Sequence, residues 1–425
     1  MRLPLLLIIA ILGARAEIVT LTLKQATALA LQQNSDILLA RLDEQKAQLE
    51  VSAVAEPLLP RIVFGSGLAY THGMPMSVEG SAPTVVQGRA IRSVYDPVKK
   101  QQAAQMRELA RGQQLTTSAT REEVLVRVAL LYLDLERYHR SLEIAERQRE
   151  NLERIAEVVK LRAEEGREPA IEVKKAELDV ARGRQRALAF SNARSAAGLT
   201  LASALGFKPE DEVRPAAEER EEWTLPESVE AGIRAGLDAN FSIRKFESDL
   251  VAKNFEAKSY RAGRFPRFDL IAQYGLLAHY NGYEDYFRKF TRNNFEFGVS
   301  IQVPLFGNAA GDAHAAQAGL DARRIRLQIQ DTRSRVSVAT RKAWDKLRES
   351  EAAREVARLD LEVARQQVTD LLALMEEGKA SLRQLEEARF QEGERWLLLY
   401  DARSSVERAR LELLKETSQV AAVLR

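Results

Sequence analysis

The sequence predicts a mainly α-helical fold with a small β part, internally duplicated, with four transmembrane β-strands and very long coiled-coil helices in each chain. Three observations support this class. Long stretches lack proline and repeat apolar residues with a helical period, four short stretches alternate apolar and polar residues, and the same landmarks occur twice along the chain.

The first segment stands apart from both halves. Residues 1–16 combine Arg2, an apolar stretch and Ala14-Arg15-Ala16, which is the pattern of a cleaved signal peptide. The apolar stretch is too short to span a membrane as a helix, which needs about 20 residues. The alternative is a buried N-terminal strand. Export to an oxidising compartment would permit disulfides, but the chain has no cysteine, so neither disulfides nor thiolate metal sites are expected.

Charge argues against a nucleic-acid partner. The chain has 63 Lys and Arg against 61 Asp and Glu. The predicted signal holds two of the arginines and no acid, so the remaining chain is balanced and has no basic excess for nucleic acid. No later stretch has about 18 uninterrupted apolar residues, so no transmembrane helix is expected, and insertion into a membrane would require strands.

The predicted long helices are bounded by prolines. None occurs between Pro97 and Pro169 or after Pro304. The first of these stretches has apolar residues at alternating spacings of four and three, the seam of helices that supercoil around neighbours. The seam consists of Val124, Val128, Leu131, Leu135, Tyr138, Leu142 and Ala145.

The four alternating stretches are residues 61–70, 84–93, 267–276 and 294–303, and the second alternates poorly. The last places Phe295, Phe297, Val299 and Ile301 on one face and Glu296, Ser300 and Gln302 on the other. Segments of this length and pattern are typical of transmembrane β-barrels, with the first set facing lipid and the second the lumen. A half-buried strand of a soluble sheet has the same pattern. Four strands alone leave two open edges, so a barrel would require several copies of the chain.

The landmarks divide the chain into repeats. Glu164-Glu165-Gly166 matches Glu376-Glu377-Gly378, and Pro60-Arg61 matches Pro266-Arg267. We therefore expect a first repeat over 17–207 with a hairpin tip at 165–169, a linker at 208–226, and a second repeat over 227–425 with a tip at 377–381. Each repeat would consist of short helices, two strands and a long helical hairpin.

With these landmarks placed, the chain resembles the TolC family of outer-membrane efflux proteins over nearly its whole mature length. The resemblance depends on the order of several short motifs. They are Leu21-Thr22-Leu23-Lys24-Gln25-Ala26, Ala30-Leu31-Gln32-Gln33-Asn34, Leu59-Pro60, Leu201-Ala202-Ser203-Ala204-Leu205-Gly206, Pro304-Leu305-Phe306-Gly307 and the two Glu-Glu-Gly turns. Val94-Tyr95-Asp96-Pro97 departs from the family pattern, which puts the geometry of the second strand in question.

The resemblance implies a homotrimer. Its four strands per chain would form a 12-stranded barrel in the outer-membrane lipid, continued by an α-helical barrel in the periplasm. Such a channel is the exit duct of a tripartite efflux or type I secretion system. Its partners would be a periplasmic adaptor, also called a membrane fusion protein, and an inner-membrane efflux pump or ABC transporter. No cofactor is implied.

The two Glu-Glu-Gly segments would form the periplasmic tips. Gly166 and Gly378 can adopt the left-handed conformation that ends a helix. Pro169 can occupy the first position of the returning helix, and Ser381 with Gln384 matches a capping box. In the family such tips are where the adaptor docks. The side chains expected to contact it are Glu165, Arg167, Glu377 and Lys379.

An enzyme is not expected. His72, His139, His279 and His314 are widely spaced and lack partners at the spacing of a metal site. The acids are scattered over helix surfaces among Lys and Arg. The alternative to a channel is an exported periplasmic coiled-coil scaffold or adaptor, which would not need paired strands in both halves. The sequence does not name the substrate.

Overall fold

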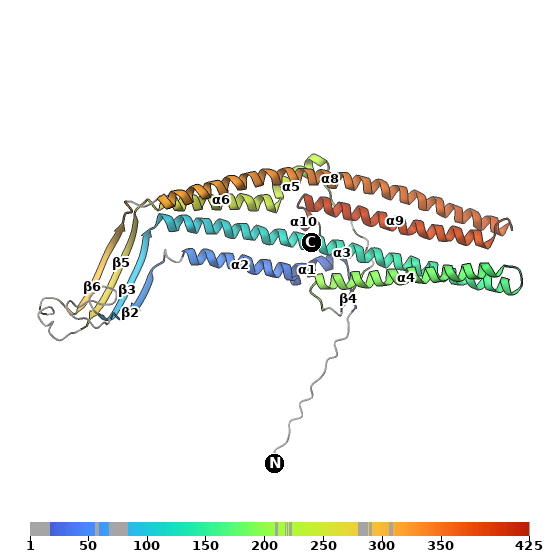
Figure 1. Ribbon diagram of the computed structural model, residues 1–425, viewed down its shortest axis with the longest axis horizontal. Coiled ribbons are helices and arrows are strands. Elements are labelled where there is room, and N and C mark those ends of the chain that lie inside the picture. The colour runs from blue at the N-terminus through green and yellow to red at the C-terminus, as the bar shows by residue number, and fades with distance from the viewer. Residues whose placement is uncertain are drawn as a thin grey trace, which may run out of the picture. The chain divides into compact units, whose positions relative to one another are not determined.

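The computed structural model describes residues 18–55, 59–67, 84–208, 211–216, 218, 220, 223–278, 288, 291–305 and 309–424. The predicted signal at 1–16 lies outside this part. The elements, in order, are β1 (Ile18–Leu21), α1 (Leu23–Gln33), α2 (Ser35–Ala55), β2 (Arg61–Gly65), β3 (Thr84–Tyr95), α3 (Pro97–Glu164), α4 (Ala170–Ala204), β4 (Glu212–Pro215), α5 (Val229–Ala239), α6 (Phe241–Ala262), β5 (Arg267–Leu277), β6 (Asn293–Gln302), α8 (Ala309–Glu376), α9 (Leu382–Glu416) and α10 (Val420–Val423) (Figure 1).

Among the described elements, both halves contain two short helices, two strands, a long helix and a returning helix in the same order. The long helices α3 and α8 have 68 residues each, and the returning helices α4 and α9 have 35 each. The short helices α1 and α5 have 11 each. These equal lengths agree with the order expected of two similar halves, while a common origin of the halves stays a prediction.

The compact units of the structure do not coincide with the predicted repeats. One unit contains Met1–Leu39, Ala119–Asn240 and Ser334–Arg425, and the other contains Ala40–Ser118 and Phe241–Arg333. Each unit therefore takes segments from both halves. The physical reason is that α3 and α8 are long enough to contribute residues to both units, so the packing does not follow the boundary between the repeats.

The core of the first unit is formed where α1, α3, α4, α9 and α10 meet the strands β1 and β4. Val124, Val128 and Leu135 of the predicted seam of α3 are buried in this core, and Leu142 and Ala145 are buried further along the helix. A second stripe, which includes Leu125 and Tyr132, is buried as well, so α3 packs on more sides than a two-helix seam requires. The Tyr132 hydroxyl donates a hydrogen bond to the carbonyl oxygen of Leu21 in β1 at 3.1 Å, which satisfies its polar group in the core.

The expected linker at 208–226 contains a strand that the sequence did not predict. β4 pairs in parallel with β1, from Ile18 opposite Glu212 to Leu21 opposite Pro215. Val213 in β4 is fully buried. Its carbonyl oxygen lies so close to Gly198 in α4 that a Cβ there would approach it to 2.8 Å. This segment is therefore a structural part of the first unit.

The second unit contains a four-stranded antiparallel sheet in the order β2-β3-β5-β6. β2 and β6 are its outer strands and each pairs on one side only among the described strands. Helices also pack together in this unit. The Ser248 hydroxyl of α6 donates a hydrogen bond to the carbonyl oxygen of Glu108 in α3 at 2.7 Å. The Thr117 hydroxyl of α3 donates one to the carbonyl oxygen of Ala40 in α2 at 3.1 Å.

The observed strand bounds differ from the expected ones at several ends. The stretch 61–70 forms a strand only over Arg61–Gly65, and residues 68–70 lie outside the described part. The poorly alternating stretch at 84–93 forms the longest strand, β3, over Thr84–Tyr95. β5 and β6 differ from the expected bounds by one residue. The departure at 94–97 is a bulge between Ser93 and Tyr95, followed at once by α3.

Candidate functional site

The two hairpin tips have the same backbone geometry. α3 ends at Glu164 and α8 at Glu376, and the glycines that follow have positive φ, 71° at Gly166 and 72° at Gly378. In each turn the residue after the glycine donates its N–H to a carbonyl five residues back, from Arg167 to Arg162 and from Lys379 to Leu374, both at 2.8 Å. These bonds are those of a Schellman motif, which satisfies the last carbonyls of a helix.

The returning helices begin differently. Ser381 and Gln384 form the expected capping box at the start of α9, with the Ser381 hydroxyl accepting from the Gln384 N–H at 3.3 Å. The sequence predicted that Pro169 is the first helical residue of α4. In the structure Pro169 is instead the N-cap residue, one position earlier, and it makes no side-chain cap hydrogen bond. A proline N-cap offers no side-chain acceptor, so α4 begins without the polar cap that α9 has.

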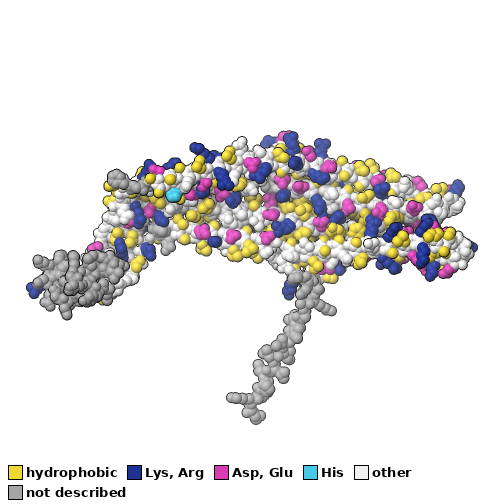
Figure 2. Space-filling model, in the orientation of Figure 1, with side chains coloured by type: hydrophobic (Ala, Val, Ile, Leu, Met, Phe, Trp, Pro, Cys, Tyr) yellow, Lys and Arg dark blue, Asp and Glu magenta, His cyan; other side chains and the backbone are white. Residues whose placement is uncertain are grey.

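The four charged tip residues form one exposed ion pair at each tip. Arg167 lies 3.2 Å from Glu165, and Lys379 lies 2.7 Å from Glu377. All four side chains are more than half exposed. Exposed pairs of this kind contribute about 0–1 kcal/mol, so they are available to a partner at little cost to the fold. Figure 2 shows that basic and acidic side chains are interspersed along the helices of the face in view.

The sequence did not predict that the two hairpins are joined near their tips. Arg383, at the start of α9, pairs with Glu172, at the start of α4, at 2.8 Å. Hydrogen bonding from Lys175 is the main cause that lowers the pKa of Glu172, and the charge of Arg383 lowers it further. Glu172 therefore stays ionised at neutral pH and bridges a basic residue of its own helix and one of the other hairpin.

A groove of about 500 Å³ lies between the same hairpins. Leu152, Ile155 and Phe390 are among the apolar residues that line it, and charged side chains that include Arg162 and Glu387 surround them. Arg186 of α4 forms a two-pronged ion pair with Glu394 of α9. A bidentate pair fixes geometry as well as charge, so it sets the spacing of these two helices.

The strand register sorts the side chains of the sheet into two faces, because residues paired across strands point to the same side. We call the first the apolar face. It consists of Ile62, Phe64, Val86, Gly88, Ala90, Arg92, Tyr95, Phe268, Leu270, Ala272, Tyr274, Leu276, Asn293, Phe295, Phe297, Val299 and Ile301. All four predicted lipid-facing residues lie on this face, and each is at least 60% exposed in the single chain. The ring of Phe64 lies over Gly88, where a Cβ would approach its Cε1 to 2.9 Å.

The opposite face, which we call the polar face, carries the predicted lumen-facing residues. Glu296 shares a row with Gln273 and Arg89, Ser300 with Asp269 and Ser93, and Gln302 lies opposite Arg267. One row has the apolar pair Ile91 and Ile271 at its centre, with Arg61 of β2 and Gly298 of β6 on either side. At the end of the face next to α3, Arg267 pairs with Asp269 at 2.8 Å and lies 3.8 Å from Asp96, which accepts a hydrogen bond from the Lys99 N–H. The register thus separates the two predicted sets, whereas their contact with lipid or lumen stays a prediction.

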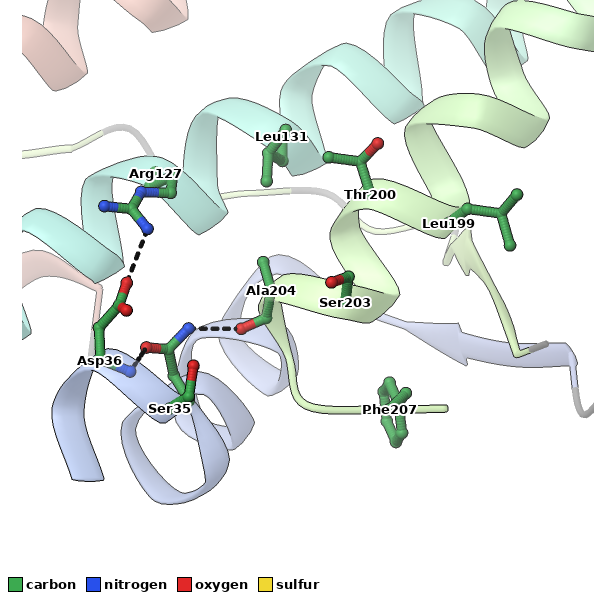
Figure 3. Close-up of a pocket in the computed structure, with 10 residues that line it drawn as sticks. Ser35, Asp36, Arg127, Leu131, Leu199, Thr200, Ser203, Ala204 and Phe207 are labelled. Carbon is green, nitrogen blue, oxygen red and sulfur yellow. Dashed lines mark hydrogen bonds and ion pairs between the residues drawn. The ribbon is translucent and has the colours of Figure 1, made fainter. Parts of the chain in front are cut away.

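A cavity of about 660 Å³ lies in the first unit where α1 and α2 meet α3 and the end of α4 (Figure 3). Its polar groups bind one another. The Asn34 amide donates to the carbonyl oxygen of Ala204 at 2.7 Å, and its side-chain oxygen accepts from the Asp36 N–H at 2.9 Å. Asp36 also pairs with Arg127 at 2.8 Å. These interactions make the cavity a structural junction between helices.

The described residues contain no group of three or more His, Asp, Glu or Cys side chains placed to hold a metal ion. His139 lies 3.5 Å from Glu143 in the same helix, and the ring of His314 lies beside that of Tyr260. His72 and His279 fall outside the described residues.

Within the part of the chain that the structure describes, no helix is long and apolar enough to cross a membrane.

Comparison with solved structures identifies the fold. The transmembrane channel protein CusC superposes with a TM-score of 0.76 at 16% sequence identity, covering 95% of this chain and 93% of that one. The Campylobacter jejuni outer-membrane channel CmeC gives 0.76 at 15% identity, covering 93% and 85%. The open state of the Neisseria gonorrhoeae outer-membrane channel MtrE gives 0.71 at 14% identity, covering 93% and 88%. The chain has the fold of outer-membrane channels.

The outer-membrane channel fold confirms the resemblance at the level of the fold and the mainly α-helical class with a small β part. The internal duplication and the trimeric barrel stay predictions. The similar proteins are channels and not enzymes, which agrees with the expectation that this chain is not an enzyme. No protein-family model matches the sequence, and no curated protein matches it. The similarity to these channels lies in the fold, since the sequence identities are only 14–16%.

Proposed function

We propose that this chain is an outer-membrane channel protein that forms, as a homotrimer, the exit duct of a tripartite efflux or type I secretion system. Its four strands would cross the outer membrane, and its helices would lie in the periplasm. The observation that carries this proposal is the four-stranded sheet, which has an apolar face, a polar face and two outer edges that are unpaired among the described strands. The channel fold supports it.

The sheet accounts for the oligomer. A strand edge in hydrocarbon leaves backbone N–H and C=O groups without hydrogen-bond partners, at several kcal/mol each. The edges of β2 and β6 can be satisfied if β6 of one copy pairs with β2 of the next. Three copies would then close a barrel of 12 strands. Closure would turn the exposed Phe297 to lipid and Glu296 to a water-filled lumen.

The tips would be the contact to a periplasmic adaptor protein, which would link the duct to an inner-membrane efflux pump or ABC transporter. Three features support this site. Each tip exposes an acid and a base held by the same Schellman turn. The apolar groove with Phe390 and Leu152 begins beside the tips and could receive apolar side chains of a helical partner. The ion pair of Arg383 with Glu172 holds the two hairpins together beside the groove.

Fractionation of the cell envelope tests the channel. We expect the chain in the outer membrane, beginning at Glu17, as a trimer that dissociates on heating, and we expect the purified trimer to conduct ions across a planar lipid bilayer. A soluble periplasmic monomer would refute the proposal and favour a scaffold or adaptor. A membrane-bound trimer without conductance would refute the duct while leaving the membrane location intact.

Lys379→Glu tests the tips. The change places a second carboxylate beside Glu377 and removes an exposed pair, so the trimer should remain as stable as the wild type to within about 1 kcal/mol. Crosslinking to the adaptor and efflux should fall. The matched control is Lys346→Glu, which breaks a similar exposed pair with Glu349 within α8, away from the tip. Equal adaptor crosslinking in both variants would show that the docking surface lies elsewhere.

A further inference from the structure

One residue of the apolar face does not fit its surroundings. Arg92 in β3 lies opposite Leu270 in β5, which lies opposite Val299 in β6. The three side chains therefore point to the same side of the sheet. Arg92 is exposed, and among the described strand residues it is the one charged side chain on the apolar face.

Arg92 also differs from Arg267, an arginine of the polar face at the end of the sheet next to α3. Arg267 pairs with Asp269 and lies near Asp96. Among the described residues no carboxylate lies within 4.0 Å of Arg92, so the sheet supplies no counter-charge. If the apolar face contacts lipid, as the proposed function requires, this guanidinium must find its partner outside the chain.

The height of Arg92 in the sheet indicates where that partner lies. An arginine on the lipid face of a barrel is costly at the membrane midplane and nearly free near the interface. The next row of the apolar face toward the helices contains Tyr95 and Phe268, whose rings are 5.9 Å apart, and α3 begins at Pro97. Arg92 is thus three residues, about 10 Å of strand, from the end of β3. Its long side chain can reach the interface at that end.

We propose that Arg92 binds the phosphate group of a phospholipid in the leaflet next to the helices, and that this contact sets the height of the strands in the membrane. Phosphate matches guanidinium in charge and in hydrogen-bond geometry. Tyr95 and Phe268 would lie at the headgroup level, where barrels place aromatic residues. The inference rests on the proposed function, because it requires the apolar face to contact lipid.

Lipid binding by the detergent-solubilised trimer tests the contact, with native mass spectrometry as the readout. We expect the wild type to retain phosphatidylglycerol in preference to diacylglycerol, which lacks the phosphate. Arg92→Gln should lower the affinity for phosphatidylglycerol about tenfold and leave that for diacylglycerol unchanged. Arg89→Gln is the matched control, because Arg89 is an exposed arginine of the same strand on the polar face.

Three outcomes would overturn the proposal. They are unchanged lipid retention in Arg92→Gln, an equal loss in Arg89→Gln, and displacement of the lipid by an equal concentration of inorganic phosphate, which would indicate a site for free anions. Arg92→Leu provides a second variant, since it removes the charge without adding polarity and should assemble at least as well as the wild type. A wild-type chain recovered as a soluble monomer would refute the proposed function itself, before any lipid is added.

The depth of the row gives an independent test that leaves Arg92 in place. The chain has no cysteine, so a single introduced cysteine can be labelled selectively. A fluorophore at Leu270→Cys, in the row of Arg92, should be quenched more by lipids brominated near the headgroup than by lipids brominated near the chain end. The same label at Tyr274→Cys, two rows further from the helices, should show the reverse order. A deep position for Leu270 would contradict the proposal.

Discussion

A pair of arginine substitutions in β6 tests the two faces of the sheet. Phe297 is 66% exposed and shares its row of the apolar face with Ala272 and Ala90. Phe297→Arg would therefore place a charge among apolar side chains with no acid in the row. At mid-strand in a lipid-facing position this costs about 2–4 kcal/mol for each chain, and three chains in a trimer multiply the penalty. We expect the heat-sensitive trimer band from outer-membrane fractions to fall sharply.

Ser300→Arg is the matched change on the polar face. Ser300 lies opposite Asp269, and an opposite charge across two strands contributes about 0.2–1 kcal/mol, so the new side chain should be tolerated. The trimer band should remain, and the ion selectivity of the channel in a planar bilayer should shift. A soluble sheet would also be destabilised by Phe297→Arg, so the comparison decides. If Ser300→Arg reduces the trimer as much as Phe297→Arg, both faces of the sheet are buried and the barrel is excluded.

Three further predictions concern the helical part. Gly378→Ala should lower thermal stability by about 1 kcal/mol, because only the positive φ opposes a Cβ there, whereas Gly319→Ala, in open space within α8, should raise it by about as much. Equal melting temperatures would contradict the assigned turn. Gly198→Ala should lower the melting temperature by more than Gly378→Ala does, because its Cβ would meet the carbonyl oxygen of Val213. An unchanged melting temperature would exclude this contact. Burial raises the pKa of the Glu122 carboxyl to about 7. The protonated carboxyl therefore contributes about 3 kcal/mol to the free energy of unfolding. This contribution is full below the ordinary carboxyl pKa and is lost as the pH rises through about 7. Urea unfolding from pH 5 to 8 should show this decline in the wild type and not in Glu122→Gln.

The sequence predicted the features that depend on local chemistry. Glycine after Glu-Glu predicted helix ends with positive φ, and both glycines have it. The serine and glutamine of the second tip predicted a capping box, which is present. Alternation predicted four strands, and the structure places them in one sheet. Each of these signals arises within a few residues, where backbone geometry and side-chain pattern are directly coupled.

Features that depend on distant packing were missed. β1 and β4 are four residues each, and such short runs carry too few alternations to distinguish them from a linker. Glu172 and Arg383 are far apart in sequence, and charged residues are frequent on both helices, so no local pattern selects this pair. The sequence assigned Pro169 to the first helical position of α4, whereas it is the N-cap residue, because a proline is suited to both positions. The second buried stripe of α3 reflects how many elements surround the helix, which periodicity alone does not count.

The incomplete pairing of the outer strands has a kinetic consequence. A newly made chain presents β2 and β6 with open edges, next to an apolar face that is largely exposed. Such edges can pair with any available strand, so the surface proposed to assemble the oligomer can also nucleate aggregates. If the chain assembles as the proposed trimer, the yield of correctly assembled protein should depend on chain concentration and on how quickly three copies meet at the membrane. Cells that make this protein would need to keep the sheet shielded in transit, by holding chaperones or by delivering chains one at a time to the site of insertion.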